Sequence, residues 1–98
     1  LFSKACDGGA ADGCYVLALS YTEGRGARQD YTKANELFSV ACDGRAAMGC
    51  VYLGHDYANG LGVRRNESQA KALYGQACDL GDQMGCDNYR KLNEAGVQ

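Results

Sequence analysis

Apolar and small side chains recur at steps of three and four residues through most of this chain, which is the spacing of one face of an α-helix. In one such segment the pattern passes through Leu53, Gly54 and Tyr57 and ends at Gly60. A glycine there favours the left-handed turn that closes a helix. The whole pattern predicts helices near residues 11–23, 30–42, 47–59, 66–79 and 83–95.

The helical pattern repeats with a period of 36 residues. Cysteine pairs mark its three copies, at Cys6 and Cys14, Cys42 and Cys50, and Cys78 and Cys86. A fixed period in the range of about 20–50 residues is typical of a repeat array. Each copy has room for two antiparallel helices, so we predict an all-α fold. It should be a right-handed superhelix, a solenoid of tetratricopeptide-like helix hairpins.

Polar residues at the expected helix starts support these boundaries. Asp30 and Asn66 stand where an N-cap side chain is expected, and Gln69 follows Asn66 at the spacing of a capping box. No proline interrupts any predicted helix.

We predict a single domain over residues 1–98. Its parts are the end of a preceding repeat's second helix, two repeats and a C-terminal capping helix, at residues 1–9, 10–45, 46–81 and 82–98. Arg90 indicates the cap, because it replaces the small Ala18 and Gly54 of the earlier copies. Because the first residues match the middle of a repeat, we expect an export leader and further sequence upstream.

The repeat symmetry favours one pairing of the six cysteines, in which the two cysteines of each copy form a disulfide. Each bond would stabilise the fold by roughly 2–3 kcal/mol in the chain-entropy model. Disulfides persist in oxidising compartments, so the protein is expected to be secreted or periplasmic. Reduced or zinc-binding cysteines are the alternative. Zinc sites of this kind usually need supporting histidines, and His55 is the single histidine. We therefore predict no metal and no cofactor.

Charge and hydropathy exclude several partners. The net charge is −2 with acidic and basic residues interspersed, which argues against nucleic acid and anionic membranes. No apolar run approaches the roughly 18 residues that span a bilayer. A protein, a peptide or a peptidoglycan-related ligand is therefore the expected partner.

The second repeat resembles the Sel1-like repeat proteins. The residues that carry the resemblance are Leu53-Gly54, Tyr57, Gly60-Leu61-Gly62-Val63, Asn66 and the neighbouring Ala70 and Lys71. The period and the paired cysteines resemble the secreted cysteine-rich subgroup, the Helicobacter cysteine-rich proteins. The first repeat departs from this pattern at Ala18 and Ala27. The resemblance implies an exported interaction protein, and some members of that subgroup are described as penicillin-binding proteins or weak β-lactamases.

One short motif bears on β-lactam chemistry. Ser68 and Lys71 have the Ser-x-x-Lys spacing of serine β-lactam enzymes at the start of a predicted helix. The chain has no Ser-Asp-Asn or Lys-Thr-Gly partner motif, and the first repeat carries Thr32 and Asn35 at the equivalent positions. Lys71 is therefore interpreted as a solvated residue on the outer face. We predict a scaffold that is not an enzyme, with a β-lactam-binding protein or weak β-lactamase as the alternative.

The first helix of each copy also carries a stripe of residues that differ between copies and lie beside the shared face. The first helices of such arrays line the concave groove, so we predict a binding surface there. Its candidate residues are Tyr15, Leu19, Met48, Val51, Tyr52, His55 and Asn59. Met84 and Asn88 continue the stripe in the third copy. We expect Tyr52 and His55 to be free of packing, and the carboxylates of Asp12, Glu23 and Asp56 to lie on the helix surface.

Overall fold

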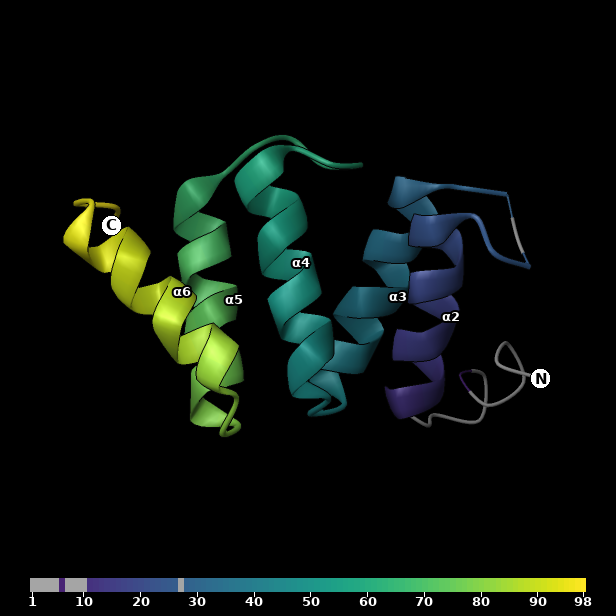
Figure 1. Cartoon of the computed structure of the whole chain (residues 1–98), viewed down its shortest axis with the longest axis horizontal. Helices are drawn as coiled ribbons and strands as arrows, with labels where there is room; N and C mark the ends of the chain where they lie inside the picture. Colours follow the sequence, from purple (N-terminus) through teal and green to yellow (C-terminus); the bar gives the residue numbers. More distant parts are fainter. Residues whose placement is uncertain (1–5, 7–10, 27) are drawn as a thin grey trace.

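The computed structural model describes residues 6, 11–26 and 28–98. That part of the chain consists of the helices α2 (Ala11–Glu23), α3 (Tyr31–Asp43), α4 (Ala47–Asn59), α5 (Glu67–Asp79) and α6 (Gln83–Glu94). Successive helices run antiparallel and follow one another along the long axis, as Figure 1 shows. The molecule measures 41 × 25 × 15 Å, as expected for an array that grows in one direction. The predicted all-α solenoid is confirmed.

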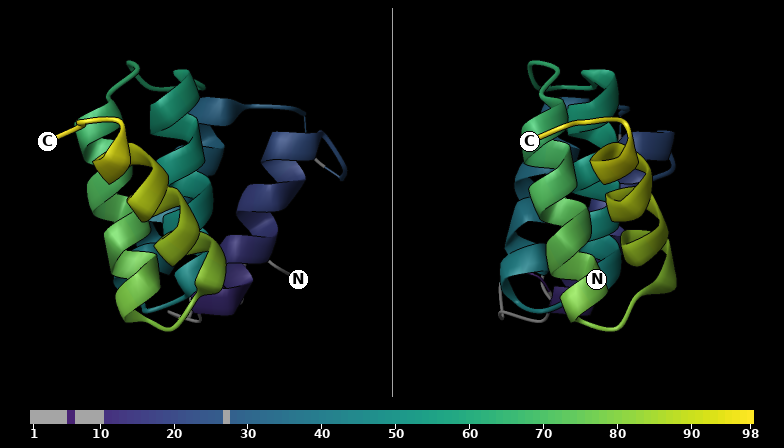
Figure 2. Two further views of the ribbon diagram at one scale, coloured as in Figure 1. Left: turned by 60° about the vertical axis from the view of Figure 1, so that its left-hand side comes forward. Right: turned by 90° about the vertical axis from the view of Figure 1, so that its left-hand side faces the viewer.

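The helices form two layers. Seen along the array, α3 and α5 lie in one layer, and α2, α4 and α6 lie in the other (Figure 2). Helix α6 contacts α4 as well as α5, so the first helices of consecutive repeats are neighbours. None of the described helices is both long enough and apolar enough to cross a membrane.

Side chains cap the helix starts as predicted. Asp30 accepts a hydrogen bond from the backbone N–H of Lys33 at 3.1 Å, and Asn66 accepts one from Gln69 at 3.0 Å. The expected second bond of the capping box is not formed. The backbone N–H of Asn66 instead donates to the carbonyl of Tyr57 at 2.8 Å, so it has no need of the Gln69 side chain.

The loops depend on left-handed backbone at a few positions. Gly60 closes α4 at a φ of 68° and donates its N–H to the carbonyl of Asp56. Gly81 adopts a φ of 94° after α5, and Arg45 has a φ of 72° at the equivalent place after α3. A non-glycine residue costs free energy in this region, so Arg45 adds local strain that the glycine of the next copy avoids.

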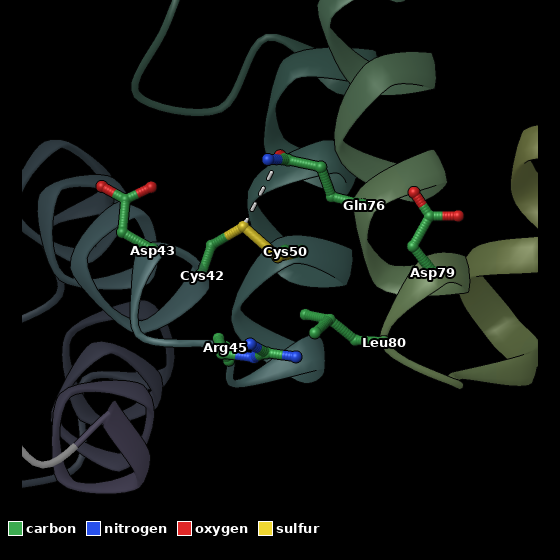
Figure 3. Close-up of a pocket in the computed structure, with 7 residues that line it drawn as sticks. All are labelled: Cys42, Asp43, Arg45, Cys50, Gln76, Asp79 and Leu80. Atoms are coloured by element: carbon green, nitrogen blue, oxygen red, sulfur yellow. Dashed lines mark hydrogen bonds between the residues drawn. A yellow bond between two sulfur atoms is a disulfide. The ribbon is translucent and has the colours of Figure 1, made fainter.

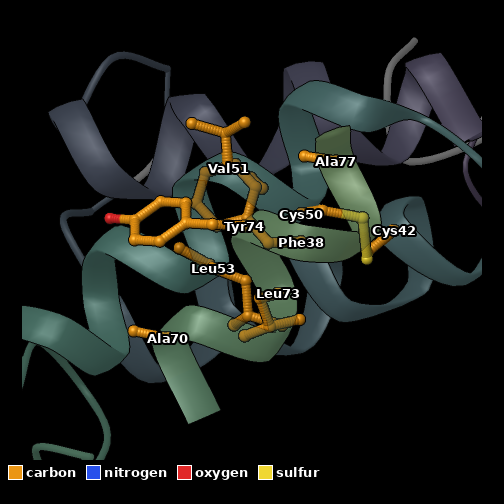
Figure 4. Packing of buried hydrophobic residues seen from close by; sticks show 11 residues of the cluster. Phe38, Cys42, Cys50, Val51, Leu53, Ala70, Leu73, Tyr74 and Ala77 are labelled. Carbon is orange, nitrogen blue, oxygen red and sulfur yellow. A yellow bond between two sulfur atoms is a disulfide. The ribbon is translucent and has the colours of Figure 1, made fainter. Parts of the chain in front are cut away.

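A continuous core links α2 to α5 around small residues and one disulfide (Figure 4). Its buried members are Ala18, Ala34, Phe38, Cys42, Cys50, Val51, Leu53, Ala70, Leu73, Tyr74 and Ala77. Three small residues of this core, Ala18, Ala34 and Ala70, are fully buried. They allow neighbouring helices to approach closely, so that larger side chains can pack around the crossings.

The three disulfides join the predicted partners, Cys6 to Cys14, Cys42 to Cys50 and Cys78 to Cys86. The second bond ties the end of α3 to the first turn of α4, and the third ties the end of α5 to the first turn of α6. Each bond therefore fixes the junction between one repeat and the next.

Lys71 joins α5 to the C-terminal segment. Its ammonium group donates to the Asn93 side chain at 2.9 Å and to the carbonyl of Val97 at 2.8 Å. It also lies 5.2 Å from the centre of the Tyr89 ring. The interpretation of Lys71 as a solvated residue is therefore wrong. The acceptors that hold the ammonium group of Lys71 belong to a segment more than 20 residues further along the sequence.

The capping role of residues 82–98 stays a prediction. The Arg90 side chain is 68% exposed and pairs with Asp87 at 3.4 Å, as expected where no further helix packs. Residues 1–9, the predicted end of a preceding helix, lie outside the described part of the chain apart from Cys6.

Two substitutions at equivalent positions test this helix register. A side chain at Gly54 would begin 3.0 Å from the Tyr74 ring and 3.3 Å from the Ala70 carbonyl. Gly54→Arg should therefore lower the free energy of unfolding by about 3 kcal/mol or more. Arg90→Gly should lower it by about 1 kcal/mol or less, the usual cost of a glycine within a helix. Urea unfolding measures both, and equal losses would show that the register is wrong.

Candidate functional site

The predicted stripe forms an aromatic cluster on α2 and α4. The rings of Tyr15 and Tyr52 lie 5.8 Å apart, centre to centre. Tyr52 also stacks on the fully buried Phe38 of α3, with ring centres 5.3 Å apart and planes 8° from parallel. The expectation that Tyr52 is free of packing is wrong. Its exposed edge belongs to the surface, but its ring face belongs to the core.

The aliphatic members of the stripe are packed to different degrees. Val51 is 4% exposed and belongs to the core. Leu19 and Met48 are half-buried and pack against the core cluster. Val51 therefore offers little surface to a partner, whereas Leu19 and Met48 each leave part of the side chain exposed.

A pocket of about 260 Å³ lies where α4, α5 and α6 meet. The residues that line it are Val51, Tyr52, His55, Tyr74, Met84 and Asn88. The first three belong to the predicted site, and the stripe of the third copy supplies Met84 and Asn88. Tyr74 was not predicted, because the pattern places it on the packed face of α5. Tyr15, Leu19, Met48 and Asn59 of the predicted site do not line this pocket.

The polar side chains in and beside the pocket form hydrogen bonds within their own helices. Asn59 donates to the carbonyl of His55 at 2.9 Å, and its amide nitrogen lies 3.3 Å from Nδ1 of that imidazole. The amide of Asn88 donates to the carbonyl of Met84 at 2.9 Å. The Asn88 amide oxygen thus remains an acceptor that a ligand could use.

Two phenols of this region, Tyr15 and Tyr74, are held in their neutral form. Burial raises the pKa of Tyr15, and the neighbouring Tyr52 raises it further. Burial also raises the pKa of Tyr74, with a smaller contribution from the charge of Asp56. The described residues that line the pocket carry hydroxyl, amide, imidazole and thioether groups, and none of them is a lysine, an arginine or a carboxylate.

Asp56 is buried, contrary to its interpretation as a surface carboxylate. The residue is 3% exposed, and its Oδ2 has no hydrogen-bond partner among the described residues. Burial raises the pKa of this carboxyl to about 7. The first repeat has Ser20 at the equivalent position, so comparison of the copies gave no sign of a buried charge.

The candidate catalytic pair shows no catalytic arrangement. Ser68 is exposed in the first turn of α5, whereas the Lys71 ammonium donates to Asn93 and Val97. That lysine is therefore not directed at the serine hydroxyl. The described residues also contain no cluster of side chains that could hold a metal ion.

A second cleft, of about 350 Å³, lies between α3 and α5 over the central disulfide (Figure 3). Asp43, Arg45 and Asp79 stand around it as exposed charges. The Gln76 side chain lies 3.8 Å from Sγ of Cys42. A disulfide sulfur has no hydrogen to donate, so any hydrogen bond here must come from the amide nitrogen.

Comparisons with known proteins agree with this architecture. The family model described as Sel1 repeat matches residues 11–44 and 47–82. Cysteine-rich protein B of Helicobacter pylori (hcpB) is 36% identical with a TM-score of 0.85, over 88% of this chain and 65% of that chain. A comparison with curated proteins gives no match.

Two further solved structures share the fold. A Sel1 repeat protein from Oxalobacter formigenes is 24% identical with a TM-score of 0.92, over 98% of this chain and 40% of that chain. A protective antigen of uropathogenic Escherichia coli with an SLR fold is 26% identical with a TM-score of 0.92, over 97% of this chain and 20% of that chain. The chain thus spans less than two thirds of each of the three solved chains.

The burial of Asp56 predicts a pH-dependent stability. Because its pKa is raised from 3.8 to about 7, the folded chain binds this proton more tightly than the unfolded chain does. The contribution of this group to the free energy of unfolding should fall as pH rises from about 4 to 7. Asp56→Asn removes the titrating group. Its effect on the free energy of unfolding should therefore be more stabilising at pH 8 than at pH 4, by about 2–4 kcal/mol. Urea unfolding at both pH values measures this difference, and an effect independent of pH would contradict it.

Proposed function

Because the chain belongs to the Sel1 repeat family, whose repeats generally mediate protein interactions, we propose that it is an exported scaffold that binds a peptide segment. The segment would lie along the face formed by α2, α4 and α6. The first helices of helix-hairpin arrays commonly supply the binding surface, and here that face carries the aromatic cluster and the pocket beside it.

The observation that carries this proposal is the size and lining of the pocket between α4 and α6. About 260 Å³ is below the roughly 300–1,000 Å³ of sites that enclose drug-sized ligands. It suits one apolar side chain of a peptide better than a whole cofactor. Met84 supports this assignment, because it is 52% exposed at the pocket and methionine adapts its shape to different partners.

The groups around the pocket can also bind the backbone of such a segment. The Asn88 amide oxygen can accept a hydrogen bond, and the exposed His55 ring can donate or accept one. An apolar anchor surrounded by a few polar contacts is the common arrangement of a binding hot spot. A peptidoglycan-related ligand with a peptide stem would use the same groups and is the second possibility that we propose.

The proposed location is an oxidising compartment outside the cytosol. Three disulfides join consecutive parts of the array, and the similarity to a cysteine-rich protein of Helicobacter pylori supports the same assignment. Reducing conditions would open the links at the repeat junctions, so the groove geometry depends on the compartment.

Variants of exposed groove residues test the proposed peptide binding. Peptides selected from a displayed random library against the oxidised protein should bind with an apolar anchor residue. Met84→Ala and His55→Ala should each weaken binding of those peptides about 5-fold to 30-fold, as measured by calorimetry. Neither change should alter the melting temperature much, because both side chains are exposed.

Val40→Ala is the matched control for the methionine variant. Val40 lies on α3 and is 51% exposed, against 52% for Met84. Its truncation should leave peptide binding unchanged. Equal binding by all three variants would move the site away from this face. Tyr52→Ala is a poor probe, because loss of the stack on Phe38 would also destabilise the core.

The alternative function, β-lactam binding or hydrolysis, predicts a different outcome. If Ser68 and Lys71 acted as nucleophile and base, purified protein would turn over a chromogenic cephalosporin and Ser68→Ala would abolish that turnover. Because Lys71 is held by Asn93 and Val97, we expect no serine-dependent turnover. Hydrolysis above the buffer rate that disappears in Ser68→Ala would reverse this ranking.

A further inference from the structure

The 36-residue period extends to one long-range hydrogen bond. In the first repeat the Asn35 side chain on α3 donates to the carbonyl of Leu61 at 2.7 Å. In the second repeat Lys71 on α5 donates to the carbonyl of Val97 at 2.8 Å. Donors and acceptors are both 36 positions apart, so the two bonds are equivalent. Each ties a second helix to the turn that follows the next first helix.

The surroundings of the two donors differ. In the second repeat an ammonium group occupies the site, where Asn93 supplies a second acceptor at 2.9 Å. The face of the Tyr89 ring, 5.2 Å away, adds a cation–π contact. In the second repeat, two oxygen acceptors and one aromatic ring thus surround the primary ammonium group of Lys71.

The first repeat has a cavity at the equivalent place. Asn35 is shorter than lysine, and Leu53 stands where the second repeat has Tyr89. A cavity of about 420 Å³ remains between α3 and α4. Asn35, Glu36 and Ser39 line it from α3, and Tyr57 lines it from α4.

One residue of the cavity wall carries a buried acceptor that lacks a donor. Asn35 is 6% exposed, and its amide nitrogen is committed to the Leu61 carbonyl, which fixes the orientation of the amide. The amide oxygen Oδ1 has no hydrogen-bond partner among the described residues. An unpaired buried acceptor costs free energy. Because Oδ1 is itself buried, a donor in the cavity would reach it only after a small shift of the Asn35 amide.

The charge around the cavity also fits a cation. Glu36 contributes a carboxylate, and no lysine or arginine belongs to the described lining. Lys33 approaches that carboxylate to 4.0 Å, but the two side chains are 49% and 67% exposed, so this ion pair is weak. Tyr57 adds an aromatic ring to the wall, as Tyr89 does in the second repeat.

We propose that this cavity binds a primary alkylammonium group, the side chain of a lysine in a partner polypeptide. The ammonium would lie beside the Asn35 amide, which itself fills the position equivalent to Lys71, with Glu36, Ser39 and Tyr57 around it. Tyr57 and His55 are two residues apart on α4, so they point in nearly opposite directions. The cavity is therefore separate from the groove proposed above, and either proposal can fail alone.

Model compounds test the site directly. Nα-acetyl-lysine methylamide is titrated into oxidised, ¹⁵N-labelled protein while the side-chain amide signal of Asn35 is followed by NMR. That signal should shift saturably. Nα-acetyl-norleucine methylamide, which has the same aliphatic chain without the charge, should bind at least 10-fold more weakly. The arginine analogue should also bind more weakly, because its planar group is larger than the ammonium that the second repeat holds.

Two variants of cavity residues and one control variant identify the residues involved. Glu36→Gln should weaken lysine binding about 5-fold, whereas Glu94→Gln, which removes an exposed carboxylate from α6, should change it less than 2-fold. Asn35→Lys supplies the ammonium from within, so it should abolish binding while the protein stays folded. If that variant does not fold, the comparison of the two glutamate variants still decides the question.

Three results would overturn the proposal. Equal affinity for the lysine and norleucine compounds would show an apolar cavity without charge recognition. Equal effects of Glu36→Gln and Glu94→Gln would show general electrostatic attraction. Shifts at other residues with none at Asn35 would place the binding elsewhere.

Discussion

Consecutive repeats meet at a glycine with almost no space around it. A Cβ atom on Gly49 would lie 2.8 Å from the Cβ of Ala41 and 3.0 Å from the backbone nitrogen of Cys42. The next junction is tighter, with the corresponding distances at Gly85 being 2.6 Å to Ala77 and 2.7 Å to the nitrogen of Cys78. Any side chain at either glycine would push the two helices apart. The spacing of α3 against α4, and of α5 against α6, depends on these two contacts.

The disulfides act at the same places. Cys42 belongs to the crowded backbone at the first glycine, and its partner Cys50 follows that glycine directly. Close packing sets the distance between the helices, and the covalent bond limits their separation. With both junctions fixed, α4 and α6 are held at the separation that leaves the pocket of about 260 Å³ between them. The dimensions of the pocket are thus a consequence of how the junctions pack.

Much of the fold could be predicted because it depends on local or periodic features. The helix ends, the N-caps at Asp30 and Asn66 and the cysteine pairs all involve residues at most eight positions apart, or positions that recur. Gln69 is an exception. Its motif was present, but the N–H that it would have bonded was taken by a carbonyl across the loop.

The site was harder to predict, because its contacts join residues that are far apart in the chain. Comparing the copies shows that Tyr52 varies, but it does not show that Phe38 lies beneath its ring. The same comparison shows that the first repeat has a serine at the position of Asp56, but it does not show that the Asp56 carboxylate is buried. Asn35 and Lys71 occupy equivalent positions in two repeats and differ in chemistry, yet each donates a hydrogen bond to the equivalent backbone carbonyl. Which groups meet is decided by packing between helices.

The positions of the disulfides also determine how the chain would respond to cleavage. Arg45 is exposed in the loop spanned by the bond between Cys42 and Cys50, so a protease that cut there would leave both fragments joined through sulfur. Arg64 is exposed in the loop between α4 and α5, which no disulfide spans. A cut there would leave α4 and α5 held together by packing alone. The covalent links therefore protect the junctions between repeats and leave the turn within a repeat as the point where the array can be divided.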